Sequence, residues 1–413
     1  VYVCITNTHT TYFSFSPFHS TVTFLERERE RERDEMRCRE MRQDMGWILI
    51  GSSIVVFLSA VVYLQYVSFQ LFSYCEGPTS SSSSSFRFLV VGDSHLLGTR
   101  RSDFDRNWVD WQVKRSLEFA IQKHDPTDLI FLGDLFDEGK RYDAKTYRKE
   151  RVRFVSTILR STHENGVRIH TIAGNHDIGN HYQLRKAKIE TFENTIGPTN
   201  YYDRICVDEK RCVSLLGVNT MALEGTPFDR DVKQNTVLFL NQIEAKREER
   251  KNDPLVLLTH YPLFRVNDAE CGPERSIEHG HVTYVHPNTK LKEKSDVLSE
   301  STSNMLLDRF EPSLVLSAHT HAVCRHRRKS MNGVLELTTS AFGWRMRPDP
   351  GYLFVTFESD PSRLDTALYC KLPHERVSIA ISITLCVISG FLVSLGLVFN
   401  LFCRGAEYRE KDK

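Results

Sequence analysis

Residues 88–95 have the sequence FLVVGDSH, in which four apolar residues run directly into Gly92, Asp93 and His95. A short apolar and β-branched run of this kind is typical of a buried β-strand. In an open α/β sheet, the polar groups that follow such strands lie at the carboxyl ends of the strands, where the active site is built. The stretch therefore predicts an α/β domain with a polar site at the end of its first strand.

Four more motifs of this kind follow along the chain, three directly after an apolar run and one, the Gly174 motif, after a less purely apolar strand pattern. The motifs are Gly133-Asp134, Gly174-Asn175-His176-Asp177, Thr259-His260-Tyr261-Pro262 and Ala318-His319-Thr320-His321. The runs before them are residues 129–132, 167–172, 255–258 and 314–316. One such motif alone is typical of a turn or a surface histidine pair, whereas five in order predict side chains that meet at one site.

Seven residues of these motifs carry donor atoms that suit metal ions: two carboxylates, one amide oxygen and four imidazoles. They are Asp93, His95, Asp134, Asn175, His260, His319 and His321. The set is too large for one tetrahedral zinc ion and contains no cysteine. Mixed oxygen and nitrogen donors suit manganese, iron or zinc. A carboxylate such as Asp134 can bridge two ions about 3.5–4 Å apart, the spacing used in phosphoryl transfer, so we expect two divalent metal ions.

The order of the motifs resembles the calcineurin-like metallophosphoesterase superfamily, whose signature is D-x-H, G-D, G-N-H-[DE], H and G-H-x-H. The resemblance implies an α/β fold, a four-layer sandwich of two mixed β-sheets flanked by helices. It implies two metal ions, with Mn²⁺ first and Zn²⁺ or iron as alternatives. It also implies two ligand groups with Asp134 as the bridge: Asp93, His95 and His321 for one ion, and Asn175, His260 and His319 for the other.

The same resemblance gives roles to the rest of the third motif. His176 would contact the phosphate and assist the leaving group, and Asp177 would orient His176. Ala318 stands where the superfamily usually has glycine, a departure that removes no ligand. The sequence has neither a G-x-S-x-G nucleophile elbow nor a phosphate-cradling G-x-x-x-x-G-K-[ST] loop, which argues against serine hydrolases and P-loop enzymes.

The second motif carries information on the substrate. Protein phosphatases of the superfamily have Gly-Asp-x-Val-Asp-Arg-Gly there, whereas residues 133–139 are GDLFDEG, with Glu138 in place of the arginine. Together with residues 261–265, this resembles the branch of the superfamily that removes ethanolamine phosphate from the second mannose of GPI anchors, over residues 46 to 413. Arg265 and Arg275 are candidate substrate contacts, because a planar guanidinium suits bidentate phosphate binding.

Two long uncharged segments frame the motifs, at residues 47–64, extended by 65–72, and at residues 377–402. Each is long enough to cross a bilayer core of about 30 Å as a helix. The sequence therefore predicts transmembrane helices at 46–72 and 377–402, and a serine-rich linker at 73–85. It predicts a metallophosphoesterase domain at 86–372 and a short tail at 403–413.

Basic residues near the two segments predict the orientation. Arg404, Arg409, Lys411 and Lys413 follow the second segment, while no lysine or arginine lies between the first segment and Arg87. Because basic residues favour the cytosolic side, we expect both tails in the cytosol and the domain in a lumen. The resemblance implies a multi-pass protein of ER exit sites, the ER–Golgi intermediate compartment and the cis-Golgi, supporting transport of GPI-anchored proteins.

The basic end of the chain, residues 409–413, resembles a dilysine-type retrieval signal, so contact with a coat or cargo receptor is expected there; a merely solvated tail is the alternative. The net charge of +1 argues against nucleic acid as a partner. Six cysteines of the expected lumenal region are compatible with disulfides, and Cys206 and Cys212 could pair across a hairpin. Free buried thiols are the alternative.

Residues 1–45 form a doubtful leader or cytosolic tail. The segment Glu26–Arg33 is a perfect Glu-Arg alternation, such as a dinucleotide repeat would encode, and Met36, Met41 and Met45 are candidate true starts. We expect no function from this segment. Two other functions compete with GPI trimming: a dimetal phosphoesterase for another lumenal substrate, and a non-catalytic trafficking module on the same fold. The complete ligand set argues against the second.

Overall fold

The computed structural model describes residues 20–76, 86–160, 162, 165–276, 286–328, 333–357 and 364–411. The chain forms two compact units, Leu64–Ile379 and Val1–Tyr63 with Ala380–Lys413. The first part of the expected leader, residues 1–19, and the serine run at 80–85 lie outside the described residues. So do the last two tail positions, residues 412–413.

The larger unit, Leu64–Ile379, contains two mixed β-sheets, each of six strands among the described residues. In spatial order, the first sheet consists of β1 (Tyr74–Glu76), β12 (Leu364–Lys371), β11 (Gly351–Phe357), β2 (Phe86–Val91), β3 (Asp128–Phe131) and β4 (Arg168–Thr171). The second consists of β5 (Tyr201–Cys206), β6 (Cys212–Val218), β7 (Leu255–Thr259), β8 (Leu314–Ser317), β10 (Leu335–Thr338) and β9 (Cys324–Arg327).

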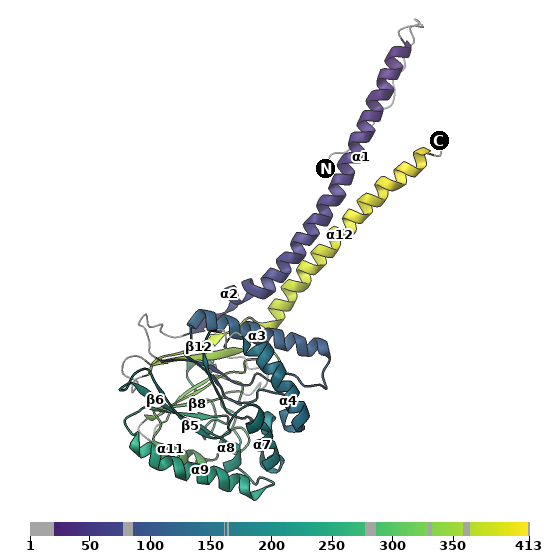
Figure 1. The fold of residues 1–413 in the computed structure, drawn as a ribbon. Coiled ribbons are helices and arrows are strands. Elements are labelled where there is room, and N and C mark those ends of the chain that lie inside the picture. The colour runs from purple at the N-terminus through teal and green to yellow at the C-terminus, as the bar shows by residue number, and fades with distance from the viewer. Residues whose placement is uncertain are drawn as a thin grey trace. The chain divides into compact units, whose positions relative to one another are not determined.

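Helices cover the outer faces of this sandwich (Figure 1). The main ones are α3 (Asp103–His124), α4 (Ala144–Arg153), α7 (Lys186–Thr195), α9 (Arg230–Glu249) and α11 (Glu300–Phe310). Short helices are α6 (Asn175–Ile178), α8 (Thr220–Leu223) and α10 (Pro273–Ser276). Figure 1 shows α3 on one side of the sheets and α9 with α11 on the opposite side. The predicted four-layer sandwich of two mixed sheets flanked by helices is confirmed.

The strands β2, β3, β7 and β8 are largely apolar and buried because both of their faces are covered, one by the other sheet and one by helices. In β2, Phe88 and Val90 pack in a core with residues of the second sheet such as Val256. Leu89 and Val91 belong instead to the core that includes helix residues such as Leu117 of α3. Alternate residues of one strand therefore enter different layers, as the two-residue period of a strand requires.

Local sequence explains where α3 begins and ends. The Ser102 side chain accepts the backbone N–H of Asp105 at 3.1 Å, which caps the first turn, and Asp125 ends the helix in a left-handed conformation with φ of 45°. Helix α4 ends at Arg153, where a π-helical turn, Phe154–Ile158, follows it.

The last part of the first apolar segment packs on the larger unit. Residues 65–72 were expected to extend the transmembrane helix, but they belong to the larger unit, where they form part of a π-helical turn (Tyr63–Val67) and α2 (Ser68–Phe72). Phe69 is 2% exposed and packs against Trp111 and Phe119, with ring centroids 6.5 and 6.0 Å away. Strand β1 likewise occupies part of the predicted linker. Burial of the aromatic side chain therefore anchors α2 in the core of the larger unit, and the end of the membrane span at residue 72 stays a prediction.

The smaller unit consists of α1 (Ser20–Val62) and the larger part of α12 (Glu375–Lys411). Two stretches of these helices, Asp44–Val62 and Glu375–Val398, are long and apolar enough to cross a membrane, judged by length and composition. Within the unit, the hydroxyls of Ser53 and Ser389 lie 2.8 Å apart and hydrogen-bond to each other. Small polar residues of this kind often link neighbouring transmembrane helices.

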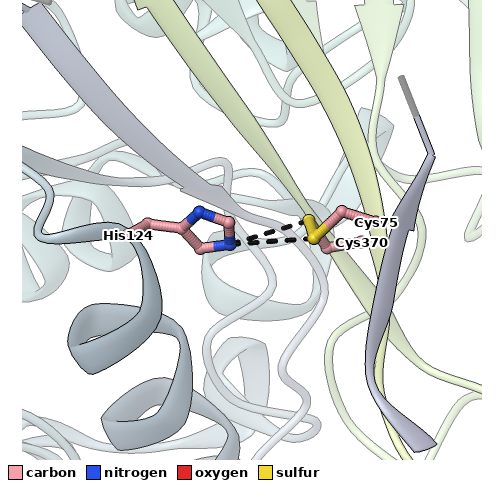
Figure 2. A group of neighbouring side chains, drawn as sticks. All are labelled: Cys75, His124 and Cys370. Atoms are coloured by element: carbon pink, nitrogen blue, oxygen red, sulfur yellow. Dashed lines mark hydrogen bonds between the residues drawn. A yellow bond between two sulfur atoms is a disulfide. The ribbon is translucent and has the colours of Figure 1, made fainter. Parts of the chain in front are cut away.

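Three disulfides link the six cysteines of the larger unit: Cys75–Cys370, Cys206–Cys212 and Cys271–Cys324. The hairpin pair Cys206–Cys212 is the one that the sequence suggested. Cys75–Cys370 joins β1 to β12, where the two residues are directly opposite. Figure 2 shows this disulfide beside His124, whose Nε2 lies 3.8 Å from both sulfur atoms.

His124 makes the stability of this region dependent on pH. Its Nε2 hydrogen-bonds the Tyr352 hydroxyl at 2.9 Å, its ring stacks on Phe354, and burial lowers its pKa to about 4 from 6.5. The folded state thus favours neutral His124, so the stabilisation is complete above pH 6.5 and declines between pH 6.5 and 4. A pKa difference of that size between the folded and unfolded states corresponds to about 3 kcal/mol of folding stability.

We therefore expect the free energy of unfolding of the wild-type protein to fall between pH 6.5 and 4. This fall should exceed the fall measured for His124→Gln by up to about 3 kcal/mol. Glutamine keeps a hydrogen-bond donor but does not titrate. Urea unfolding of the detergent-solubilised chain, followed by fluorescence at several pH values, measures the difference. Parallel pH profiles for the two proteins would contradict the assignment.

Candidate metal centre

The five motifs lie at the carboxyl ends of strands in the two sheets. Strands β2, β3 and β4 pair in parallel, and so do β7 and β8. The motifs follow these five strands directly, which places Asp93, Asp134 and Asn175 after the first sheet and His260 and His319 after the second. Parallel neighbours end at the same edge of a sheet, and for that reason the polar residues collect there.

The backbone at the site is held in an unusual conformation. Among the described non-glycine residues with positive φ, five are predicted metal ligands: Asp93 (52°), His95 (45°), Asp134 (51°), His319 (68°) and His321 (57°). Left-handed backbone is uncommon for residues with a side chain, and such positions cluster at functional sites, at a cost of about 1–3 kcal/mol each. The backbone conformation of these turns therefore orients the predicted ligand side chains toward the site, at a cost in stability.

One group of predicted ligands is Asp93, His95 and His321, whose ligand atoms lie within 4.8 Å of one another. Asp93 Oδ1 and the Nε2 atoms of both histidines are buried without a hydrogen-bond partner in the described part of the chain. Asp93 Oδ2, by contrast, accepts the backbone N–H of His319 at 2.9 Å. Buried polar atoms without partners need an explanation, and three that converge fit a bound cation.

The other group is Asp134, His260 and His319, again with ligand atoms within 4.8 Å. His260 Nδ1 donates to the Leu132 carbonyl at 2.7 Å, and His319 Nε2 donates to the Ser295 carbonyl at 2.7 Å. Each ring therefore has a second nitrogen that can bind a metal once the ring is neutral, the arrangement that outer hydrogen bonds produce in metal-ligating histidines. Burial opposes protonation of His260, but the charge of Asp134 outweighs it and raises the pKa of His260 to about 9, so His260 would release a proton on binding a metal. The fourth predicted ligand, Asn175, places its Oδ1 3.0 Å from His260 Nε2.

Asp134 lies between the groups. Its Oδ2 is 3.5 Å from His95 Nε2 and 3.5 Å from His260 Nε2, while its Oδ1 accepts the backbone N–H of His176 at 2.7 Å. A Cβ on Gly174 would come within 2.1 Å of Asp134 Oδ1, so only glycine fits there. The structure thus brings the seven predicted ligands together in the predicted division, and their role as ligands remains a prediction.

The protonation of two histidines also suits metal binding. Burial lowers the pKa of His95. Burial, together with the nearby His260, lowers the pKa of His319 to about 3. Both rings are therefore neutral near pH 7, the form in which imidazole binds a metal.

His176 stands at the edge of the centre with its side chain 30% exposed. Its Nδ1 donates to the Asp137 carbonyl at 2.8 Å, which leaves Nε2 for a substrate. The prediction that Asp177 orients this ring is wrong. The buried Asp177 carboxylate accepts the backbone N–H groups of Gly174, Leu135 and Phe136 at 2.9, 3.2 and 3.0 Å, so it ties the second and third motifs together.

Asp137 is the functional residue that sequence reasoning missed. Its Oδ1 lies 3.3 Å from His95 Nδ1 and 3.8 Å from His176 Nδ1, and its Oδ2 lies 3.6 Å from Arg345 Nε. Burial opposes ionisation, but the hydrogen bond with His95 and the charge of Arg345 lower the pKa of Asp137 to about 2. The only signal for it was its place in the second motif, three residues after Asp134.

The arginines predicted to bind phosphate do not reach the centre as expected. Arg265 and Arg275 are 4% and 3% exposed, and their Nε atoms pair with the two oxygens of Asp268 at 2.8 and 2.9 Å. Through Nε these guanidinium groups hold a buried ion pair with Asp268 in the loop after the fourth motif, and their role as substrate contacts stays a prediction. Arg345, which was not predicted, lies beside Asp137 at the predicted site.

Two departures from family patterns also have a structural account. Glu138, in place of an arginine, has a buried carboxylate that pairs with Arg100 at 2.9 Å. The Ala318 methyl is buried, and a Cβ on Gly92 would lie 2.7 Å from it. The methyl group of Ala318 is thus accommodated because Gly92 has no side chain.

The similarity of the chain to known proteins agrees with this geometry. Residues 86–323 match the family model described as calcineurin-like phosphoesterase. A sandwich of two sheets with a two-metal ligand set at its strand ends defines a metallophosphoesterase, a metal-dependent hydrolase of phosphoric esters. The chain belongs to the calcineurin-like phosphoesterase family.

Two curated relatives carry the same name. Metallophosphoesterase 1 of Ailuropoda melanoleuca is 30% identical over 381 residues, which covers 86% of this chain and 90% of that protein. Metallophosphoesterase 1 of Danio rerio is 29% identical and covers 83% of this chain and 91% of that protein. A solved dimetal phosphatase from Danio rerio aligns with 11% identity and a TM-score of 0.43, over 67% of this chain and 94% of that one. The family assignment rests on the sequence matches.

Proposed function

We propose that the protein is a lumenal dimetal phosphodiesterase that removes ethanolamine phosphate from the second mannose of GPI anchors, with Mn²⁺ as its metal. The observation that carries the proposal is the bonding of all six cysteines in the catalytic unit, with a candidate span on each side. Disulfides persist in oxidising compartments, and GPI glycans face such a compartment.

The residues of the centre suit phosphodiester hydrolysis. When bound, the two ions supply an activated water at neutral pH and neutralise charge on the phosphoryl oxygens. His176 is placed to protonate the leaving oxygen through Nε2, because Nδ1 is engaged by Asp137. Asp137 and Arg345 hold each other at the edge of the site, where Arg345 can attract an anionic diester.

The proposal extends to location and partners. We propose that GPI-anchored proteins are the substrates, that the protein works from ER exit sites to the cis-Golgi, and that its basic tail contacts a coat or cargo receptor. Supporting this is the sequence of the tail, in which Arg409 and Lys411 precede Lys413. We propose no nucleic-acid partner.

A single assay separates this function from its rivals. The full chain in detergent with Mn²⁺ is incubated separately with an aryl phosphodiester and with a GPI glycan bearing ethanolamine phosphate. The products are identified by mass spectrometry. We expect both to be cleaved, with the glycan losing one ethanolamine phosphate, and a chelator to stop both reactions. Cleavage of the aryl diester alone would favour another lumenal substrate, and cleavage of neither would favour a non-catalytic module.

The orientation has its own test. Protease added outside sealed microsomes should trim the tail at 403–413 and leave residues 86–372 intact, because the membrane shields a lumenal domain. Epitopes placed in the tail and in the domain report the two outcomes on one blot, with detergent-opened microsomes as the control. Digestion of the domain in sealed vesicles would put the centre in the cytosol and remove GPI glycans as substrates.

A further inference from the structure

A second pocket lies beside the metal centre, within the larger unit. It has a volume of about 250 Å³, and its walls include Arg101, Asp105, Trp108, Trp344, Arg345 and Glu375. Small-molecule pockets usually measure about 300–1,000 Å³, so this one suits a single group of roughly monosaccharide size. None of the predicted metal ligands lines it.

Arg345 connects this pocket to the catalytic residues. Its guanidinium lines the pocket, and its Nε is 3.6 Å from Asp137 Oδ2. The other oxygen of Asp137 faces His95 Nδ1 at 3.3 Å and His176 Nδ1 at 3.8 Å. One guanidinium and one carboxylate therefore separate the pocket from the place where a phosphodiester would react, so a group attached to that phosphate can reach it.

The aromatic wall of the pocket is held rigidly. Trp108 stacks on Trp111 at 5.1 Å and lies 5.2 Å from Trp344, measured between ring centroids. The indole N–H of Trp108 donates to Glu375 Oε1 at 3.3 Å, and that of Trp344 donates to the Pro373 carbonyl at 3.0 Å. Trp344 is 5% exposed, whereas Trp108 remains partly exposed. Core packing accounts for Trp344 but leaves Trp108 as a fixed surface for a ligand.

The charges of the pocket indicate which ligand fits. Two cations, Arg101 and Arg345, face two anions, Asp105 and Glu375, so the walls have no net charge. An ammonium ligand would favour an excess of anions around the indoles, and an aliphatic chain would be opposed by four charged groups. A hexose has hydroxyls that both donate and accept, and a C–H face that matches the electron-rich face of an indole.

We propose that this pocket is a subsite for one hexose of the substrate, stacked on Trp108, with its hydroxyls bonded to Glu375 and Arg345. The inference rests on the proposed phosphodiesterase function and deepens it. It assigns the residues that distinguish a phosphodiester attached to a glycan from one that carries no sugar. Glu375 is also the first residue of the candidate span Glu375–Val398.

Kinetic specificity tests the subsite. A methyl mannoside bearing an ethanolamine phosphodiester and an aryl phosphodiester are compared as substrates of the full chain in detergent. We expect Trp108→Ala to lower the ratio of their kcat/KM values by about tenfold or more, mainly through KM for the mannoside. Trp108→Phe, which retains an aromatic ring, should recover part of the ratio. Trp47→Ala, in the other unit, is the matched control and should keep the wild-type ratio.

A binding measurement separates failure of the subsite from failure of the proposed function. Saturation-transfer NMR with methyl mannoside should show binding to the wild-type chain and to Trp47→Ala, and clearly weaker binding to Trp108→Ala and Glu375→Gln. Unchanged binding in these two variants, or none in the wild type, overturns the subsite. Mannoside binding by a wild-type chain that cleaves neither diester would keep the subsite and overturn the phosphodiesterase function.

Discussion

Asp134→Ala is expected to lose both bound metal ions and to lower phosphodiester hydrolysis by more than about 10³-fold. Asp134 Oδ2 lies 3.5 Å from a histidine of each ligand group, so its removal affects both ions at once. Its Oδ1 also holds the backbone N–H of His176. Asp134→Asn can keep that hydrogen bond while removing the charge, and it should therefore bind metal poorly but retain the fold.

Elemental analysis by mass spectrometry, together with initial rates on an aryl phosphodiester, measures both effects. Asp103→Ala is the matched control, because the Asp103 side chain is 93% exposed at the start of α3, and it should behave as wild type. Two ions still bound to Asp134→Ala would show that the bridging role belongs to another group.

His176→Ala should separate chemistry from metal binding. The ring makes its hydrogen bond to the Asp137 carbonyl and sits beside the ligand groups without belonging to the predicted seven. We expect metal content to stay near normal while turnover on an ethanolamine phosphate ester falls by about 10²–10⁴, the usual effect of losing a positioned general acid. A nitrophenolate leaving group needs little protonation, so its release should slow much less.

Rates on the two substrates, measured with metal content in the same preparations, decide between the roles of His176. Equal losses on both would indicate that His176 binds phosphate and does not protonate the leaving group. Loss of metal would make it a ligand. His286→Ala, an exposed histidine in the loop after the fourth motif, provides the comparison and should change neither quantity.

The strands and the convergence of the seven predicted ligands were predictable because both depend on local patterns. An apolar run followed by Gly-Asp or Gly-Asn-His specifies a buried strand and a polar turn within a few residues, as in residues 88–95. The role of Asp177 was not predictable in this way. Its neighbour in sequence is His176, but in the single turn of α6 its side chain points to the backbone of the second motif.

Contacts across long sequence distances account for the other features that the sequence patterns did not show. Arg265 and Arg275 have the right chemistry for phosphate, but the loop that carries them is closed by Cys271–Cys324 and turns both toward Asp268. Arg345 comes near the centre from a loop that no motif marks. In residues 65–72, hydropathy alone cannot distinguish a membrane helix from an aromatic anchor such as Phe69, which is buried by α3.

The bond between Cys75 and Cys370 makes the catalytic unit, in effect, a closed ring of polypeptide. The two sulfurs join residues 295 positions apart, one in β1 after α2 and the other just before the second candidate span. Tension that reaches the unit through either end would be borne by a covalent bond and would bypass the hydrogen bonds of the sheets. A nick in an outer loop would likewise leave both fragments joined. The chain enters this ring in β1 and leaves it in the neighbouring β12. A secreted version could therefore be made by removing the residues before Cys75 and after Cys370. New termini could be placed elsewhere in the ring by circular permutation.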